Sequence, residues 1–198
     1  MRKTRGVGVA WWSVCFLLLA ASAPAGTVSW NFNYRDSNFP DEAKDDLTAA
    51  GAVISKWFNT VSNVAIDIDV RAFNKKNGSL GNAGSGKAGY HTNFDRTVVQ
   101  HKILSGVDAN GASADGELNV NFNAGYKWGY GEEVPRAKMD FKAMLIHEFV
   151  HTLGFAGDID TTDAAKTGEN RVTQWTVFDK FCSDDAGNLM VRRSDGFF

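Results

Sequence analysis

Cysteine is almost absent from this chain, whose 198 residues include two, Cys15 and Cys182. Two cysteines cannot build the dense disulfide framework that stabilises many small secreted domains. Proline is equally scarce, with three residues, which excludes proline-rich linkers between domains. No apolar run reaches the roughly twenty residues that cross a bilayer. The fold must therefore be held together by a hydrophobic core, and the chain is long enough for one such domain.

The longest apolar run lies near the N-terminus and has the pattern of a secretory signal peptide. Three basic residues precede an apolar stretch from Val9 to Ala21, and small residues follow it as far as Ala25. We predict that residues 1–25 are a signal peptide cleaved near Ala25, and that the mature chain is secreted without a stable membrane anchor. An uncleaved N-terminal anchor is the alternative.

No sign of charge dominates the chain, which has 21 basic and 23 acidic residues. Removal of the predicted signal peptide would leave 18 basic and 23 acidic residues. A mildly acidic protein lacks the basic surface that nucleic-acid binding requires, so we expect no nucleic-acid partner. Removal would also leave Cys182 alone, as a buried apolar side chain, a free thiol or half of an intermolecular bridge. The sequence does not indicate an oligomeric state.

The first half of the mature chain has the pattern of a strand, a helix and a second strand. Val28–Tyr34 alternates apolar and polar residues, which predicts a half-buried strand. Pro40 opens a predicted helix whose apolar positions recur at spacings of three and four as far as Val61. Val64–Arg71 alternates again and predicts the second strand.

The second half predicts a loop, two strands and a late helix. Residues 74–89 are rich in glycine, asparagine and lysine, which is typical of a loop. Residues 97–104 and 118–123 predict strands. An apolar helix is predicted from Pro135 or Arg136 to Leu153, with Gly154 as its C-terminal cap at positive φ. This order predicts an α+β fold with a mixed sheet, a late helix and a short C-terminal subdomain.

Histidine is scarce too, yet two of the four histidines lie four positions apart in the run His147-Glu148-x-x-His151. Residues four apart share one face of a helix, so both imidazoles can bind one metal ion. Such a run is expected by chance in fewer than roughly one sequence in a hundred of this length. Burial of these three side chains on an apolar helix would be costly without a metal partner. We predict His147 and His151 as zinc ligands and Glu148 as general base.

The stretch from His147 to Phe155, with the pattern H-E-x-x-H-x-L-G-F, resembles the metzincin zinc peptidases, especially leishmanolysin-like and related secreted microbial metalloproteases. Residues 114–128 and 178–181 resemble the flanking segments of such proteins. The resemblance implies a twisted mixed sheet with an active-site helix and a catalytic domain over residues 26–198. It also implies a secreted zinc metalloendopeptidase that hydrolyses extracellular protein or peptide with a zinc-activated water.

The resemblance further implies a glycine turn that brings in a third zinc ligand, and here the chain departs from the family. Gly157 stands six positions after the second histidine, where metzincins usually carry a third. Asp158 is our first choice, because some small secreted metzincins use aspartate. Asp160, Asp179 and Glu169 are alternatives, as is a ligand missing from a C-terminally incomplete chain. The family's methionine turn would fall at Met190.

Two other interpretations stay open. The acidic loop with Asp158, Asp160 and Asp163 could be solvated or bind Ca²⁺ weakly. The competing function is a non-catalytic secreted module with a degenerate protease fold, which binds a metal or a partner without cleaving it. Glu148 favours the enzyme, because a pure metal-binding module needs no general base there. The sequence does not indicate the substrate specificity.

Overall fold

A computed structural model of the protein describes residues 26–89, 93–159 and 174–191. The predicted signal peptide therefore lies outside the described residues, as do three acidic residues named in the sequence analysis: Asp160, Asp163 and Glu169. Among the described helices, none has the length and apolarity needed to cross a membrane.

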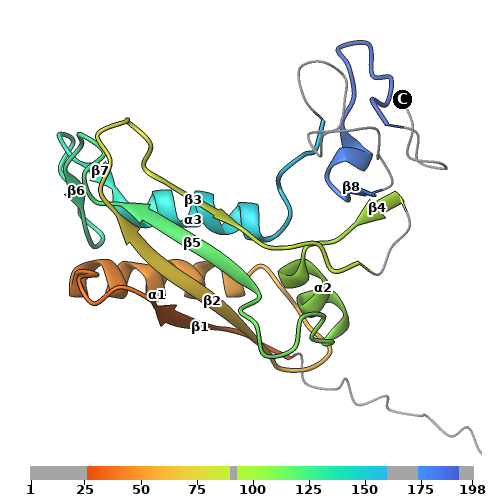
Figure 1. The fold of residues 1–198 in the computed structure, drawn as a ribbon, viewed down its shortest axis with the longest axis horizontal. Coiled ribbons are helices and arrows are strands. Elements are labelled where there is room, and N and C mark those ends of the chain that lie inside the picture. The colour runs from red at the N-terminus through yellow and green to blue at the C-terminus, as the bar shows by residue number, and fades with distance from the viewer. Residues whose placement is uncertain (1–25, 90–92, 160–173, 192–198) are drawn as a thin grey trace, which may run out of the picture.

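The main part of the fold is a four-stranded sheet in the order β1-β2-β5-β3 (Figure 1). The strands are β1 (Val28–Tyr34), β2 (Val64–Phe73), β3 (Gly81–Gly84) and β5 (Gly116–Asn121). β1 and β5 run parallel to β2, whereas β3 pairs antiparallel with β5 at one edge. The sheet is mixed, and the chain is an α+β protein as the sequence predicts.

Two helices, α1 (Asp41–Ser55) and α3 (Phe141–Thr152), lie beside each other along the sheet (Figure 1). Both contribute side chains to one hydrophobic core with β1, β2 and β5. The ring of Phe149 on α3 is fully buried, with its centroid 4.9 Å from Trp30 and 5.9 Å from Phe32 of β1. Aromatic packing of this kind fixes α3 against the sheet.

The alternate residues of β1 and β2 carry polar side chains that pair with each other across the strands. Asn31 of β1 donates to Asp67 at 2.9 Å, and Arg35, directly after β1, donates to Asp69 at 2.7 Å. The apolar residues that alternate with them are buried in β2 as far as Val70, whereas most of those in β1 are half-buried against the core. The alternation of apolar and polar residues in the sequence therefore indicates a sheet with one apolar and one polar face.

Residues 97–104, predicted as a strand, instead form helix α2 (Val98–Ser105). The hydroxyl of Thr97 accepts a hydrogen bond from the backbone N–H of Gln100 at 3.1 Å, which caps the first turn. Gly106 ends the helix with φ of 72°. The prediction was wrong because Val98 and Val99 favour strands by propensity, and capping and burial override that weak preference.

The glycine-rich stretch at residues 74–89, predicted as a loop, contains the edge strand β3. A Cβ atom at Gly81 would lie 2.8 Å from the backbone oxygen of Asn119 on β5. Glycine is therefore used here for the close approach of two backbones rather than for a turn. Composition alone does not distinguish these two uses of glycine.

Both long helices are shorter than predicted. α1 ends at Ser55, so Trp57 and Val61 lie beyond it, with 54% and 88% of their surface exposed. α3 begins at Phe141 rather than near Pro135, because the Asp140 side chain accepts the N–H of Ala143 at 2.9 Å and caps the helix there. Before α3, the short strands β6 (Trp128–Gly129) and β7 (Met139–Asp140) pair in parallel.

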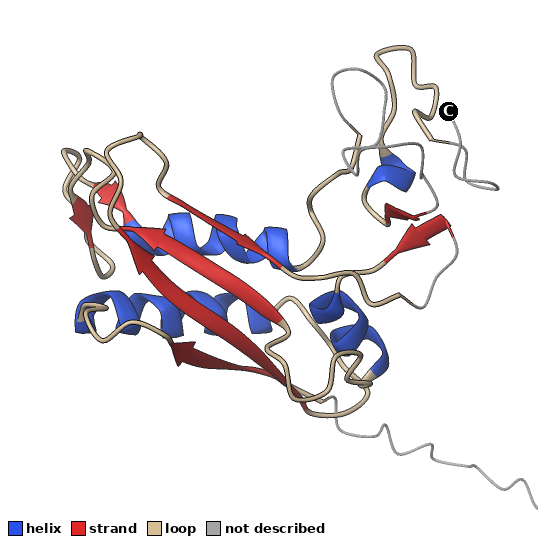
Figure 2. Cartoon of the chain, viewed as in Figure 1, coloured by secondary structure: helices blue, strands red, loops and turns tan. Residues whose placement is uncertain are grey.

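A smaller part of the fold lies beyond the end of α3 (Figure 2). It contains β4 (Asn93–Asp95), which pairs in parallel with β8 (Gln174–Thr176), and the short 3₁₀ helix η1 (Asp179–Phe181). Phe94, Trp175 and Val191 form its separate apolar cluster. The predicted C-terminal subdomain therefore includes a strand from the middle of the chain.

Candidate metal centre

Helix α3 places His147 and His151 one turn apart on one side. Their rings are nearly perpendicular, with centroids 4.9 Å apart, and their two Nε2 atoms are 3.2 Å apart. The apolar surroundings in the sequence predicted that both side chains would be buried, but His147 is exposed and His151 is half-buried. The two nitrogens therefore converge at the surface, where a metal ion can reach them.

The separation of the two Nε2 atoms matches what zinc requires of two histidine ligands. Zn–N bonds of about 2.0 to 2.1 Å at a tetrahedral angle place two ligand nitrogens roughly 3.3 Å apart. The observed 3.2 Å agrees with this spacing. The two rings therefore have the spacing that two zinc ligands would need, and without an ion the same two nitrogens lie within hydrogen-bond distance of each other.

The orientation of the His151 ring is set by the turn that ends α3. Gly154 has φ of 90°, and the N–H of Phe155 reaches back to the oxygen of Val150 at 3.1 Å. This turn brings the carbonyl oxygen of Phe155 to 2.8 Å from Nδ1 of His151. Because a carbonyl oxygen can only accept, Nδ1 carries the proton and Nε2 keeps its lone pair for a metal.

Glu148 lies between the two histidines in sequence but points toward strand β3. Its side chain is buried and accepts the backbone N–H of Ala83. Burial raises the pKa of the Glu148 carboxyl above its ordinary value, while His151, His147 and the Ala83 N–H act in the opposite direction. A carboxylate with a raised pKa is a better proton acceptor near neutral pH.

Asp158, the first choice for the third ligand, is held by two contacts in the described structure. Its carboxylate forms an ion pair with Lys87, from the segment after β3. Its backbone N–H donates to both carboxylate oxygens of Asp179 at 3.1 Å. Among the residues that the structure describes, no three metal-ligating side chains form a group that could hold an ion. The assignment of Asp158 stays a prediction.

Asp179, an alternative ligand, is fully buried at the start of η1. Besides the Asp158 N–H, its carboxylate accepts the backbone N–H and the hydroxyl of Thr176, both at 2.8 Å. The Thr176 hydroxyl in turn accepts the N–H of Asp179 at 3.2 Å. This reciprocal pair has the hydrogen-bond pattern of a capping box, at the turn between β8 and η1, and the T-x-x-D spacing in the sequence is the signal that could have revealed it.

Gly157 lies against the same carboxylate. A Cβ atom at Gly157 would lie 2.6 Å from Oδ1 of Asp179, closer than such contacts allow. A side chain at this position would displace Asp179. A histidine at position 157, where the metzincin pattern has its third, would therefore meet this carboxylate.

Cys182 and Met190 lie in the segment after η1. The Cys182 thiol is half-buried, approaches the oxygen of Phe178 at 3.7 Å and is not in a disulfide. Burial and then the charge of Asp179 raise its pKa. The N–H of Met190 donates to the oxygen of Cys182 at 3.0 Å. A methionine turn at Met190 stays a prediction.

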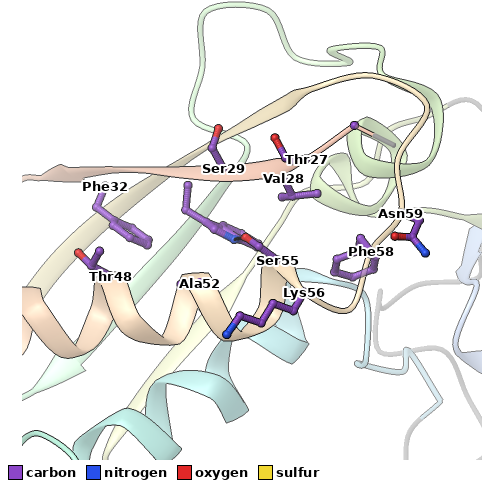
Figure 3. A pocket seen from close by; sticks show the side chains of 12 residues that line it. Thr27, Val28, Ser29, Phe32, Thr48, Ala52, Ser55, Lys56, Phe58 and Asn59 are labelled. Atoms are coloured by element: carbon purple, nitrogen blue, oxygen red, sulfur yellow. Dashed lines mark hydrogen bonds between the residues drawn. The ribbon is translucent and has the colours of Figure 1, made fainter. Parts of the chain in front are cut away.

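A cavity of about 690 Å³ lies elsewhere, between the start of β1 and the end of α1 (Figure 3). The side chains of Val28, Phe32, Ala52 and Phe58 line it, with the polar Ser55 beside them. Its lining includes no residue of the histidine motif, so the candidate site rests on the geometry of α3 and not on this cavity.

Comparison of the chain with known proteins found no matching family model, no matching curated protein and no matching solved structure. Its function must be argued from α3 and the residues around it.

Proposed function

We propose that the protein is a secreted zinc metalloendopeptidase of metzincin type, with a metzincin-like arrangement of sheet and metal helix. His147 and His151 bind the zinc ion, and Glu148 is the general base. The observation that carries this proposal is the pair of Nε2 atoms 3.2 Å apart, with a buried carboxylate on the intervening residue.

Each side chain has a separate task in peptide hydrolysis. When bound, zinc supplies a Lewis acid that lowers the pKa of the attacking water. Glu148 accepts a proton from that water and passes it to the leaving amine. The raised pKa that burial gives Glu148 suits both steps, because the acid form must also be accessible. The Phe155 carbonyl keeps His151 in the tautomer that binds metal.

The position of β3 supports an extended peptide as substrate. β3 is the last strand of the described sheet and pairs with β5 alone. Its Ala83 contacts Glu148 through the backbone N–H, so this edge lies directly beside the general base. An extended peptide can add to a strand edge through main-chain hydrogen bonds, with little dependence on its ends. Such binding is suited to cleavage within a chain, in extracellular proteins or peptides.

The second candidate is the non-catalytic module that binds metal or a partner. Two observations favour it: the described residues contain no three-ligand group, and the Asp158 carboxylate is paired with Lys87. Catalytic zinc has three protein ligands and one open position. If no third ligand exists, zinc binding would be weak and hydrolysis slow.

The substitution Glu148→Ala tests the enzyme directly. We expect the mature variant to bind one zinc ion, as the wild type does, and to lose about a hundredfold or more of its activity. Metal analysis and cleavage of casein measure the two properties on the same sample. His147→Ala is the matched control and should lose zinc and activity together. Equal activity in the wild type and Glu148→Ala would refute the proposed role.

A further inference from the structure

The segment that follows α3 is tied to η1 at two points. The ring of Phe155 lies 5.9 Å from that of Phe178, and the N–H of Asp158 donates to the Asp179 carboxylate. Asp179 is itself fixed through the capping box with Thr176 on β8. The smaller part of the fold therefore holds residues 155–158.

This segment is the one that orients a predicted zinc ligand. The Phe155 carbonyl lies 2.8 Å from Nδ1 of His151, three residues before the N–H that Asp179 accepts. The backbone of Gly157, between them, lies so close to Asp179 that a Cβ atom there would be 2.6 Å from Oδ1. We therefore expect a shift of the Asp179 carboxylate to move this backbone and, with it, the Phe155 carbonyl.

We propose that Asp179 is a positioning residue of the metal centre. Its carboxylate holds the backbone N–H of Asp158, which keeps the Phe155 carbonyl on Nδ1 of His151 and the Nε2 lone pair directed at the metal. Partners of this kind commonly change metal affinity by about ten- to a hundredfold when they are lost. The inference rests on the proposed zinc site, but its effect on His151 can be measured without metal.

The substitution Asp179→Asn weakens the contact between the side chain of residue 179 and the N–H of Asp158. An amide has one acceptor oxygen and one donor NH₂ group. In the wild type the N–H of Asp158 lies 3.1 Å from both carboxylate oxygens. If the amide oxygen keeps the two Thr176 donors, this N–H keeps one acceptor but faces the donor NH₂ group in place of the other, which weakens the contact. The buried shape is preserved. Thr176→Val is the matched control, because it removes the hydroxyl from the same carboxylate and leaves the Asp158 N–H bonded.

Two measurements on the mature protein test the proposal. Zinc affinity is determined by competition with a chelator, and the His151 tautomer by ¹⁵N NMR of the metal-free protein. We expect Asp179→Asn to bind zinc about tenfold or more weakly and to lose the preference for a proton on Nδ1. Thr176→Val should lower the melting temperature but keep the zinc affinity and the tautomer.

The outcomes separate this proposal from the proposed function. The positioning role of Asp179 would be overturned if Asp179→Asn kept the zinc affinity and the His151 tautomer of the wild type. It would also be overturned if Thr176→Val lost as much zinc affinity as Asp179→Asn. A wild type that binds no zinc would overturn the proposed function, while the tautomer would still decide the role of Asp179. If Asp179→Asn does not fold, Gly157→Ala displaces the same carboxylate from the other side and should give the same two losses.

Discussion

Gly157 shows how a single residue restricts the ligand set of the metal centre. The Asp179 carboxylate occupies the space that a side chain at this position would need. A third histidine six positions after His151 is therefore incompatible with the observed packing. If zinc binds here as proposed, a third ligand must come from another residue, and Asp158 is the next along the chain.

Asp158 has two alternative roles, and a pair of substitutions separates them. As a zinc ligand, its loss in Asp158→Ala should lower zinc affinity by about tenfold or more, because an anionic oxygen leaves the metal. Lys87→Met removes the ion-pair partner and should leave the affinity unchanged or raise it. Zinc titration against a chelator measures both.

Asp163→Ala, further along the same loop, is the control and should change little. Equal losses in Asp158→Ala and Lys87→Met would mean that the carboxylate acts through its ion pair and not through the metal. If Asp160→Ala or Asp179→Ala is impaired instead, the ligand was misassigned and the proposal of an enzyme still stands. If none of these changes lowers zinc affinity, the result would argue that the third ligand is missing from this chain and would count against catalysis.

Asp69 makes a contribution to stability that depends on pH. The hydrogen bond from Arg35 holds the pKa of its carboxyl below the ordinary value of about 3.9. A carboxyl whose pKa is lowered by folding stabilises the folded state above the unfolded pKa, and this contribution is lost as pH falls through the folded pKa.

Asp69→Asn should therefore unfold at a lower urea concentration than the wild type at pH 7. The difference should shrink as the pH falls below about 4, where the wild-type carboxyl becomes protonated. The effect is small because half of the Arg35 side chain is exposed to solvent. A difference that grows at low pH would contradict this assignment.

At the scale of elements, α3 packs one face into the core and carries the two histidines on the other. Phe141, Leu145 and Phe149 recur at a spacing of four and are fully buried against α1 and the sheet. The histidines lie on the side away from Phe149, where solvent reaches them. Packing of the apolar face therefore determines the side toward which the two histidines point.

The N-terminal cap of α3 is the local feature that decides where this helix begins. Asp140→Ala removes the acceptor for the Ala143 N–H and should lower the free energy of unfolding by about 1 kcal/mol. Urea unfolding followed by circular dichroism measures the change. Asp140→Asn keeps a side-chain oxygen and is the control, with an expected loss well below that of alanine. Equal losses in the two variants would show that the charge and not the cap matters.

At the scale of the whole molecule, the two parts of the fold meet at the C-terminal end of α3. The hydroxyl of Thr97, at the start of α2, donates to the oxygen of Thr152 at 2.8 Å. Asp179 and Lys87 then hold the segment beyond the helix. Helix α3 therefore packs in the main core, while the residues that orient His151 contact both parts of the fold.

The predicted cleavage site adjoins the start of the described fold. Gly26 donates its N–H to the oxygen of Thr60 at 2.7 Å, and a Cβ atom there would lie 2.2 Å from the backbone of Ser62. If residues 1–25 are a signal peptide, N-terminal sequencing of the secreted protein should begin at or near Gly26. Recovery of Met1 on a soluble cytosolic product would contradict secretion.

The sequence by itself predicted the features that depend on neighbours in the chain. The alternation in residues 28–34 and 64–71 predicted β1 and β2, since side chains of a strand point to opposite faces in turn. The spacing of His147 and His151 predicted two nitrogens on one side of a helix, which the structure confirms. Their role in binding zinc stays a prediction.

Tertiary structure decided the features that depend on residues far apart in the chain. β3 exists because Gly81–Gly84 can approach β5 more than thirty residues later. α2 replaces a predicted strand because Thr97 caps it and its valines are buried in the core. Asp179 reaches Asp158 across 21 residues and excludes a side chain from position 157. Local sequence patterns do not predict such contacts, because burial and hydrogen bonding between distant segments exist only once the chain is packed.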